Sequence, residues 1–333
     1  MNVAIIGAGL IGKKRASALD TKYDKLIMVC DINSKKAKKL GDDYGVSWTE
    51  DINEISNNKD IDVVIISIVN KYTLQVANKM LENKKHILCE KPLGRNLKES
   101  ETILKKGIES GKLIKTGFNH RFHPSIIKAK SIIDEGKLGG IINIRGRYGH
   151  GGRPGMEKEW RCSKDLCGGG ELLDQGIHLI DLTNYFVKRK INEVFGILKT
   201  SFWKTKVEDN AFFHLISGKI IAQLHVSWTN WKNIFSYEIF FENGYMSING
   251  LGGSYGKESL EVGIRNPKGG APTTKQYDWP GKDVSWSLEW ENFRNAINNN
   301  TNPNGNGVDG LNANKIIDAI YKSNQIGSPF IIA

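Results

Sequence analysis

The chain has 333 residues, of which 39% are hydrophobic and 25% charged, a composition typical of soluble globular proteins. This length favours two domains over one. No apolar run is long enough to span a bilayer and no signal segment precedes the first predicted strand, so we expect neither a membrane protein nor an exported one. The net charge is +11, but the lysines are scattered without a dense basic stripe, which argues against nucleic-acid binding.

The four cysteines are Cys30, Cys89, Cys162 and Cys167, and none forms a C-x-x-C pair. Cys30 and Cys89 lie in apolar, strand-like segments, where a reduced thiol serves as a small hydrophobe. A reducing cytoplasm fits this usage best. A zinc site built from Cys162, Cys167 and His150 or His178 would match no common ligand spacing, so we expect no metal.

The strongest motif follows the first predicted strand, Val3 to Ile6. That strand breaks into Gly7-Ala8-Gly9-Leu10-Ile11-Gly12, which opens a helix predicted over residues 11–19. A second predicted strand ends at Asp31. Strand, glycine motif, helix, strand and acid in this order predict a dinucleotide site.

The three glycines have separate roles in such a site. Gly7 permits the tight turn, Gly9 lets the backbone approach a pyrophosphate, and Gly12 lets helix and strand pack closely. The helix N-terminus adds unpaired N–H groups and a positive dipole end.

Asp31 bears on the choice of dinucleotide. A carboxylate here can accept both ribose hydroxyl protons of NAD and would repel the extra phosphate of NADP. Lys35 and Lys36 follow a few residues on. We therefore favour NAD and leave NADP open; the alternative for Asp31 is a plain strand-end cap.

Helices and strands alternate up to about residue 120, which predicts a doubly wound parallel sheet of the Rossmann type. The further helices are predicted over 34–44, 74–83 and 97–110, and the further strands over 46–48, 61–68, 86–89 and 112–116. The strand ends meet at one edge, where a ligand binds. The segments expected there are Gly7 to Gly12, Asp31, Ser67 to Asn70, Glu90 to Pro92 and Gly117 to Arg121.

After residue 120 the regular alternation of predicted helices and strands ends, and several strands follow one another along the chain. Strands are predicted over 141–148, 193–200, 210–216, 220–228, 236–242, 245–249 and 260–264, and helices over 124–135, 172–186, 286–298 and 311–325. We expect a Rossmann domain over 1–120 and, over 121–333, an α+β domain with a large, mainly antiparallel open sheet that binds substrate. Alternating aromatic residues suggest that its outer face forms a subunit interface. They are Phe212, Trp228, Trp231 and Phe240.

Two segments carry reactive side chains. Glu90-Lys91-Pro92 follows a predicted strand, which places an ammonium near the cofactor, and a cis bond before Pro92 would fix the turn. Asp174 and His178 are four residues apart on a predicted helix and share a face. A carboxylate beside an imidazole fixes its tautomer and raises its basicity, as a proton shuttle requires.

The ordered set of motifs resembles the glucose-fructose oxidoreductase/inositol dehydrogenase (Gfo/Idh/MocA) family over essentially the whole chain. The set comprises the glycine motif, Glu90-Lys91-Pro92, Gly117-Phe118-Asn119-His120-Arg121-Phe122, Trp160-Arg161 and Gly168-Gly169-Gly170 before Asp174 and His178. The resemblance implies a Rossmann domain, an α+β domain with an open sheet, a nicotinamide cofactor, and homodimers or homotetramers formed through that sheet. It also implies Lys91, Asp174 and His178 as the catalytic set. One departure is Val69-Asn70-Lys71-Tyr72-Thr73, where the family often has Pro-Asn and a later His.

These features predict oxidation of a secondary alcohol on a sugar or cyclitol ring, or the reverse reduction. His178 would take the hydroxyl proton, Asp174 would orient it, and Lys91 would stabilise the alkoxide or itself act as base. The residues expected at the cofactor are Gly7, Gly9, Leu10, Ile11, Gly12, Asp31, Ile68, Asn70, Glu90, Lys91, Asn119 and Arg161. Those expected at the substrate are Lys91, Arg121, Tyr148, Trp160, Asp174 and His178.

The positive charge and four arginines around the expected cleft favour an anionic substrate such as a nucleotide sugar over a free sugar or cyclitol. They are Arg121, Arg147, Arg153 and Arg161. Two other functions fit the same fold: an NAD-dependent glycoside hydrolase that acts by transient oxidation, and a non-catalytic cofactor-sensing regulator.

Overall fold

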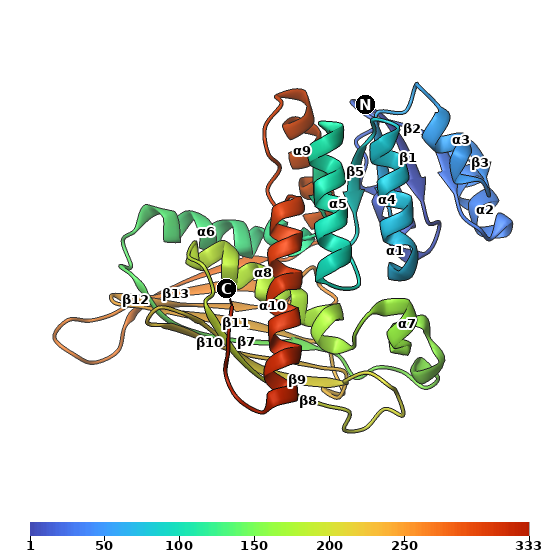
Figure 1. Cartoon of the computed structure of the whole chain (residues 1–333). Helices are drawn as coiled ribbons and strands as arrows, with labels where there is room; N and C mark the ends of the chain where they lie inside the picture. Colours follow the sequence, from blue (N-terminus) through green and yellow to red (C-terminus); the bar gives the residue numbers. More distant parts are fainter. Residues whose placement is uncertain (333) are drawn as a thin grey trace. The chain divides into compact units, whose positions relative to one another are not determined.

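The computed structural model describes residues 1–332, which form two compact units (Figure 1). The first unit comprises Met1–Phe118, Asp165–Gly168 and Trp286–Asn314. The second comprises Asn119–Lys164, Gly169–Ser285 and residues 315–332. The expected division at residue 120 differs from this, because two later segments return to the first unit. Trp290 and Phe293 explain the larger one, since both are buried in the core of the N-terminal sheet.

The first unit is built on a six-stranded parallel sheet with strand order β3-β2-β1-β4-β5-β6. The strands are β1 (Asn2–Ile6), β2 (Lys25–Cys30), β3 (Ser47–Thr49), β4 (Val63–Ile66), β5 (His86–Cys89) and β6 (Ile114–Thr116). The order reverses direction between β1 and β4, and the strand ends at this switch point are where such sheets bind ligands. This is the doubly wound sheet predicted from the sequence.

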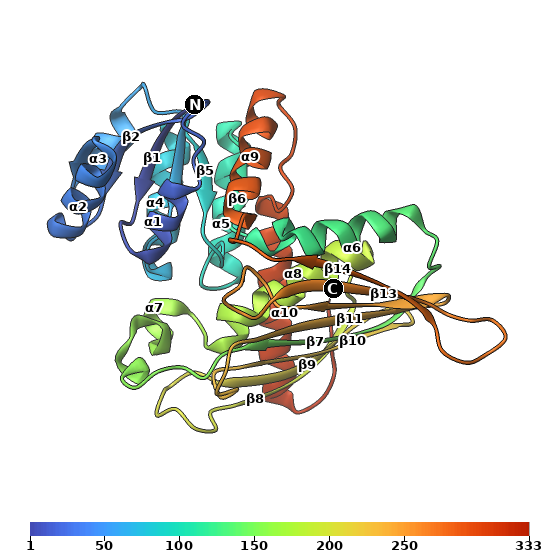
Figure 2. The same ribbon diagram turned by 180° about the vertical axis from the view of Figure 1, so that it is seen from behind.

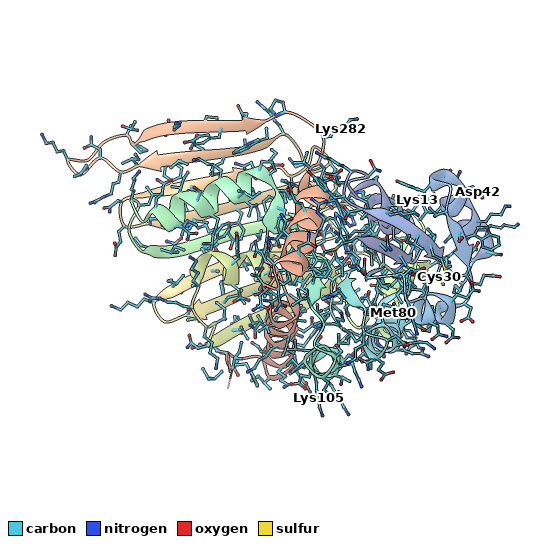
Figure 3. The ribbon with its side chains drawn as sticks, turned by 90° about the horizontal axis from the view of Figure 1, so that it is seen from above. Lys13, Cys30, Asp42, Met80, Lys105 and Lys282 are labelled. Carbon is cyan, nitrogen blue, oxygen red and sulfur yellow. The ribbon has the colours of Figure 1, made fainter. Side chains whose placement is uncertain are left out.

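Helices cover both faces of this sheet (Figure 2). One face packs on α3 (Ile52–Asn57), α4 (Thr73–Glu82) and α5 (Leu97–Ser110). The other packs on α1 (Leu10–Ser17), α2 (Ser34–Tyr44) and α9 (Ser285–Asn298). Figure 3 shows the side chains of the unit: Cys30 and Met80 are buried in the first of these layers, whereas Lys13, Asp42 and Lys105 are exposed.

The second unit is built on a nine-stranded sheet with strand order β14-β13-β12-β11-β7-β10-β9-β8-β15. Every neighbouring pair is antiparallel except β7 and β10, which are parallel. The strands are β7 (Ile141–Gly149), β8 (Glu193–Lys199), β9 (Asn210–Ser217), β10 (Ile220–Ser227), β11 (Ile234–Phe241), β12 (Gly244–Asn249), β13 (Glu258–Ile264), β14 (Thr273–Trp279) and β15 (Phe330–Ile331). The expected open, mainly antiparallel sheet is therefore present.

The helices of the second unit pack on one face of its sheet. They are α6 (Pro124–Glu135), α8 (Ile177–Val187) and the C-terminal part of α10 (Gly307–Ile326). Along β10, Ala222, Leu224 and Val226 are buried on that side, and Ile221 is exposed on the other. The alternation follows from the two-residue period of a strand.

The aromatic side chains predicted to share the outer face are divided by the structure. Phe212 is 49% exposed there, and Phe240 is half-buried on the same side. Trp228 is fully buried, because it continues the alternation of Leu224 and Val226. Trp231 is exposed, but it lies in the loop between β10 and β11. The prediction for these two tryptophans was wrong.

Several elements lie outside the predicted pattern. The short helices α3 and α7 (Lys164–Cys167) and the edge strands β14 and β15 were not expected. Strand β14 is largely exposed, so its sequence lacks the apolar alternation of a half-buried strand. Among residues 1–332, no helix has the length and apolar character needed to cross a membrane.

Candidate functional site

The glycine loop of the first unit requires glycine at two positions. Gly7 has φ of 101°, and a Cβ atom there would lie 2.2 Å from the carbonyl oxygen of Ser67. A Cβ atom on Gly12 would lie 1.8 Å from the carbonyl oxygen of Gly7. At Gly9 an added Cβ would meet nothing within 4 Å, so the backbone there faces open space. The loop thus combines a close turn, close helix packing and an accessible backbone, as a pyrophosphate site needs.

Asp31 follows β2 and holds the glycine loop. Its carboxylate accepts hydrogen bonds from the backbone N–H of Ala8 and of Asn33, both at 2.8 Å. Two oxygens offer about four acceptor positions, so capacity remains for ribose hydroxyls. Beside the loop, Leu10 and Ile32 are 72% and 88% exposed. The arrangement fits a dinucleotide: open backbone for the phosphates, a carboxylate for the ribose and apolar surface for a ring.

The loop after β4 is fastened to the glycine motif. The Ser67 hydroxyl donates to the Gly7 carbonyl at 2.9 Å, and the Ile68 side chain lies next to Gly7. Asn70 is buried, and its amide donates to the Cys167 carbonyl at 2.9 Å. Of the two expected cofactor residues here, Ile68 therefore lies directly at the loop, and Asn70 ties α7 to the strand end.

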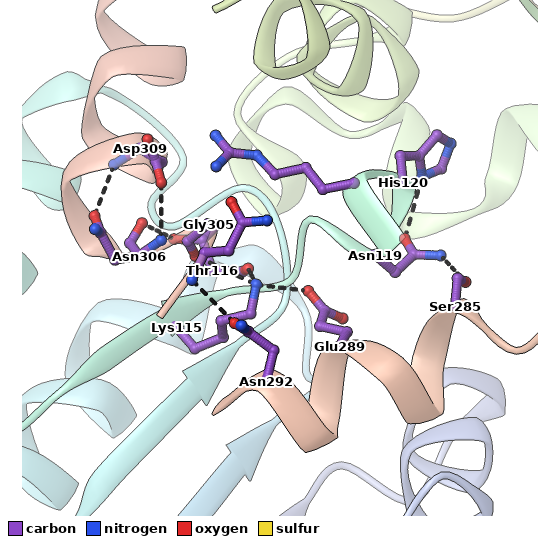
Figure 4. A network of polar contacts seen from close by, with 12 residues as sticks. Lys115, Thr116, Asn119, His120, Ser285, Glu289, Asn292, Gly305, Asn306 and Asp309 are labelled. Carbon is purple, nitrogen blue, oxygen red and sulfur yellow. Dashed lines mark hydrogen bonds and ion pairs between the residues drawn. The ribbon is translucent and has the colours of Figure 1, made fainter. Parts of the chain in front are cut away.

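Glu90-Lys91-Pro92 follows β5, and the Lys91–Pro92 bond is cis. Arg15, on α1, donates through Nε to the Glu90 carboxylate at 2.7 Å and through a terminal nitrogen to Glu289 at 2.6 Å. Figure 4 shows Glu289 reaching Lys115, whose ammonium lies 3.0 Å away. The residue before Lys91 is thus anchored by a buried chain of charges that the sequence motifs did not reveal.

The buried side chains of Arg15, Glu289 and Lys115 stay ionised because they pair with one another. Burial alone would lower the pKa of Arg15, but Glu289 and Glu90 outweigh it and raise that pKa above its ordinary value. Burial alone would raise the pKa of Glu289, but Arg15 and Lys115 outweigh it and hold that pKa below its ordinary value. The side chains of Arg15, Glu289 and Lys115 are essentially inaccessible to solvent.

In the second unit, Asp174 and His178 do not share one regular α-helix as expected. Asp174 lies in a π-helical turn, Leu172–Gly176, and His178 in the first turn of α8. The wider π turn is a frequent feature of functional sites. The Asp174 side chain is 25% exposed and lies 4.0 Å from Nε of Arg161, while His178 is 4% exposed.

Glu208 fastens the start of this turn. Its carboxylate accepts from the backbone N–H of Gly170 at 3.0 Å and of Leu172 at 3.2 Å, and from the Tyr321 hydroxyl at 2.7 Å. Burial raises the pKa of Glu208, although these hydrogen bonds oppose the rise. Sequence reasoning missed Glu208, because it lies far along the chain from the turn that it holds.

Aromatic side chains enclose His178. His120 stacks on it with ring centroids 3.7 Å apart and an interplanar angle of 19°. Tyr148, from β7, contacts His178 edge-on at 6.2 Å and Tyr255 at 4.9 Å. Burial raises the pKa of Tyr148 well above its ordinary value, with Tyr255 adding to the effect. Tyr148, which was expected to bind substrate, therefore lies beside His178. His120 also belongs to this site, although the sequence analysis assigned it no role of its own.

The arginines expected around a cleft are dispersed. Arg121 is buried and binds both carboxylate oxygens of Asp181, at 2.8 and 2.6 Å. Arg147 is exposed on the face of the sheet opposite Tyr148, since neighbouring strand residues alternate. Arg153 pairs with Glu159 at 2.6 Å. Arg161 lies 4.0 Å from the Asp174 carboxylate, and it also stacks on Trp160 at 4.8 Å.

Asn119 opens the short helix that carries His120 and Arg121. Its amide nitrogen donates to the Ser285 hydroxyl at 3.0 Å, and its oxygen lies 3.2 Å from Nδ1 of His120 (Figure 4). Expected as a cofactor residue, Asn119 is thus buried and orients His120. Within residues 1–332, no group of three or more His, Cys, Asp or Glu side chains is arranged to hold a metal ion.

Two family models match the chain. "Oxidoreductase family, NAD-binding Rossmann fold" matches residues 1–118, and "GFO/IDH/MocA C-terminal domain" matches residues 126–247. The uncharacterized oxidoreductase YrbE of Bacillus subtilis is 27% identical, over 98% of this chain and 95% of its own length. The scyllo-inositol 2-dehydrogenase (NAD(+)) of Bacillus subtilis is 32% identical, over 58% of this chain and 56% of its own.

A solved structure shares the fold over both chains. Levoglucosan dehydrogenase in complex with NADH and L-sorbose has a TM-score of 0.91 and 23% identity, and the match covers 100% of this chain and 99% of that one.

Proposed function

Because the chain belongs to the Gfo/Idh/MocA oxidoreductase family and uses NAD as its cofactor, we propose that it oxidises a secondary alcohol of a cyclitol or sugar, or reduces the matching ketone. NAD, when bound, accepts the hydride or returns it. The glycine loop and Asp31 would hold it. The observation that carries the proposal is that this chain, as a member of the family, has the glycine loop together with Lys91, Asp174 and His178.

Oxidation of the alcohol requires the loss of a hydride from carbon and of a proton from oxygen. The alcohol C–H bond breaks and its electron pair leaves with the hydrogen, the O–H proton passes to His178 and then to solvent, and a C=O bond forms. The Asp174 carboxylate orients the imidazole, and the Lys91 ammonium stabilises the developing negative charge on oxygen. In the alternative assignment Lys91, rather than His178, accepts the proton.

For the substrate we propose an uncharged cyclitol or free sugar. The expectation of an anionic substrate depended on four arginines, but Arg121 is committed to Asp181, Arg147 lies on the open face of the sheet and Arg153 pairs with Glu159. Two relatives support the uncharged class, since they are named levoglucosan dehydrogenase and scyllo-inositol 2-dehydrogenase. Their matches span 51% and 56% of their own lengths.

We propose that copies of the chain associate through the open face of the nine-stranded sheet. That face has a hollow of about 310 Å³ lined by Arg145, Phe195, Phe212, Gln223, His225 and Glu238. Its apolar side chains include Phe212 and Ile221, each 49% exposed. An apolar surface with charged residues of both signs suits a self-complementary interface. We also propose a reducing cytoplasm for the enzyme, because its four cysteines are buried and none of them forms a disulfide.

The test is NAD reduction, followed by absorbance, with a panel of cyclitols, free sugars and nucleotide sugars. We expect turnover with an uncharged ring, at least about 100-fold slower in Lys91→Ala and in His178→Ala, because each removes a group that acts on the transition state. The matched control is Lys105→Ala, an exposed lysine of α5, which should retain full activity. Bound NAD without turnover on any substrate, or unchanged rates in both variants, would contradict the proposal.

A further inference from the structure

Two buried histidines, His120 and His178, stack face to face in the second unit. The ring centroids lie 3.7 Å apart, the planes are within 19° of parallel, and the two residues are 6% and 4% exposed. Two positive charges at this separation, largely out of water, repel strongly. A neutral ring facing an imidazolium is instead attractive, because the aromatic face carries negative charge density.

The surroundings hold His120 in one orientation. Asn119 donates through its amide nitrogen to Ser285, whose hydroxyl donates to Asp283 at 2.6 Å. The Asn119 oxygen therefore faces Nδ1 of His120, at 3.2 Å (Figure 4). An amide oxygen only accepts, so Nδ1 carries a hydrogen in both charge states and His120 titrates at Nε2.

Other ionisable groups of the unit lie near the pair. His123 packs edge-on against His120 at 5.6 Å and contacts Glu258 at 3.2 Å and Asp283 at 3.9 Å. The remaining groups, by element, are Tyr148 on β7, Glu171 and Asp174 at the π turn, Tyr255 in the loop before β13, and the pair of Arg121 with Asp181 on α8. They set the common environment of both rings, and His120 lies face to face with His178.

We propose that His120 is a positioning residue for His178 and that the stacked pair holds one proton at a time. The inference rests on the proposed role of His178 as proton acceptor. A proton already on His120 would prevent His178 from taking the hydroxyl proton of the substrate. A neutral His120 would stabilise the imidazolium that forms on His178 during oxidation. The stack thus makes proton transfer depend on the charge of a residue that does not itself react.

The direct test is NMR titration of the labelled imidazoles, which needs no substrate. In the wild type, we expect the protonated fractions of His120 and His178 to sum to about one at pH values where independent imidazoles would sum to about two, near pH 5. In His120→Phe and in His178→Phe, the remaining imidazole should protonate fully there. A wild-type sum near two, or a remaining imidazole that titrates as in the wild type, would overturn the proposal.

A kinetic test follows once a substrate is known. His120→Phe keeps a ring in the stack but cannot bind a proton, so the acid limb of the kcat/KM profile should move to lower pH, by about 0.3 unit if the two sites bind the proton equally well. His120→Gln should do the same if the Phe variant folds poorly. His214→Phe is the control and should leave the limb in place. If the acid limb of the kcat/KM profile is unchanged in both His120 variants, the charges of His120 and His178 are not coupled. This result would refute the inference without affecting the evidence that the enzyme reduces NAD.

Discussion

The carboxylate of Asp31 has two tasks in this chain. It anchors the glycine loop through the N–H groups of Ala8 and Asn33, and it is the group proposed to bind the cofactor ribose. An acid at this position favours NAD because it accepts from the ribose hydroxyls and repels an added phosphate.

We predict that Asp31→Ser raises the KM for NAD about tenfold, since it loses a charge-assisted hydrogen bond of roughly 1.5 kcal/mol. The ratio of NADP to NAD turnover should rise, because the repulsion is removed as well. Steady-state kinetics with both cofactors measures this. Asp42→Ser, at an exposed position of α2, is the control. A cofactor ratio equal to that of the wild type would contradict the assignment.

Individual residues show how far sequence reasoning reaches. The glycine loop, Asp31 and Lys91 could be located because their neighbours along the chain form recognisable patterns. Arg15, Glu208 and His120 could not be assigned roles, because each acts through partners distant in sequence. Arg15 and Glu289, for example, are 274 residues apart. Arg121 was predicted to bind substrate, but its guanidinium binds Asp181. Asp181 lies 60 residues away along the chain, so no local pattern indicates this contact.

At the scale of elements, helices with clear end signals were predicted best. Helix α5 begins after Asn96, whose side chain accepts from the Glu99 N–H, and ends at Gly111 with φ of 67°. The predicted bounds agree with the structure at both ends. The π turn at Leu172–Gly176 was missed, because an apolar pattern does not separate a π turn from an α turn.

Glu208 gives the π turn its support, and we predict that its removal is costly. Glu208→Ala leaves two backbone N–H groups and the Tyr321 hydroxyl without this acceptor, which should lower the free energy of unfolding by roughly 2–4 kcal/mol. Activity should fall with it, since the turn carries Asp174. Denaturant unfolding and kcat are the measurements; a loss below about 0.5 kcal/mol would show that the turn holds without Glu208.

The raised pKa of Glu208 also predicts a pH effect with a definite sign. A carboxyl whose pKa is higher in the folded than in the unfolded state contributes stability below its unfolded pKa and loses that contribution as pH rises through the folded value. The wild type should therefore gain stability relative to Glu208→Gln as pH falls from 7 to 5. The same unfolding measurement at the two pH values checks this, and an opposite trend would contradict it.

At the scale of the whole molecule, the chain returns to its first unit late in the sequence through α9. Glu289 on this helix pairs with Arg15 and Lys115 inside the unit. Because its pKa is lowered, Glu289 contributes stability above its unfolded pKa, near 4.5, and that contribution is lost as pH falls through the folded value.

We predict that Glu289→Gln destabilises the protein by roughly 3–5 kcal/mol at neutral pH, because two buried cations lose their shared counter-charge. The deficit should shrink in acid, where the wild type also loses the charge. Thermal unfolding at pH 7 and below pH 4 measures both effects. Glu291→Gln, an exposed neighbour on α9, should behave as the wild type at each pH. Equal stability of the Glu289 variant at pH 7 would argue against the ion chain.

The open sheet face bears on assembly. Phe212→Asp places a charge in the middle of the proposed interface, so we expect a smaller oligomer by light scattering. Ile108→Asp changes a side chain that is 75% exposed on α5 and should leave the mass unchanged. If Phe212→Asp has the same mass as the wild type, the chain does not associate through this face.

The central claim is net oxidation of a carbinol by NAD, and deuterium transfer tests it most directly. The substrate identified in the panel is labelled with deuterium at the reacting carbon, and the nicotinamide product and the sugar product are analysed together by mass spectrometry. We predict one deuterium in each reduced nicotinamide formed, with an equal amount of ketone. Release of an aglycone with no accumulated reduced nicotinamide would contradict the claim and indicate a hydrolase that oxidises its substrate only transiently.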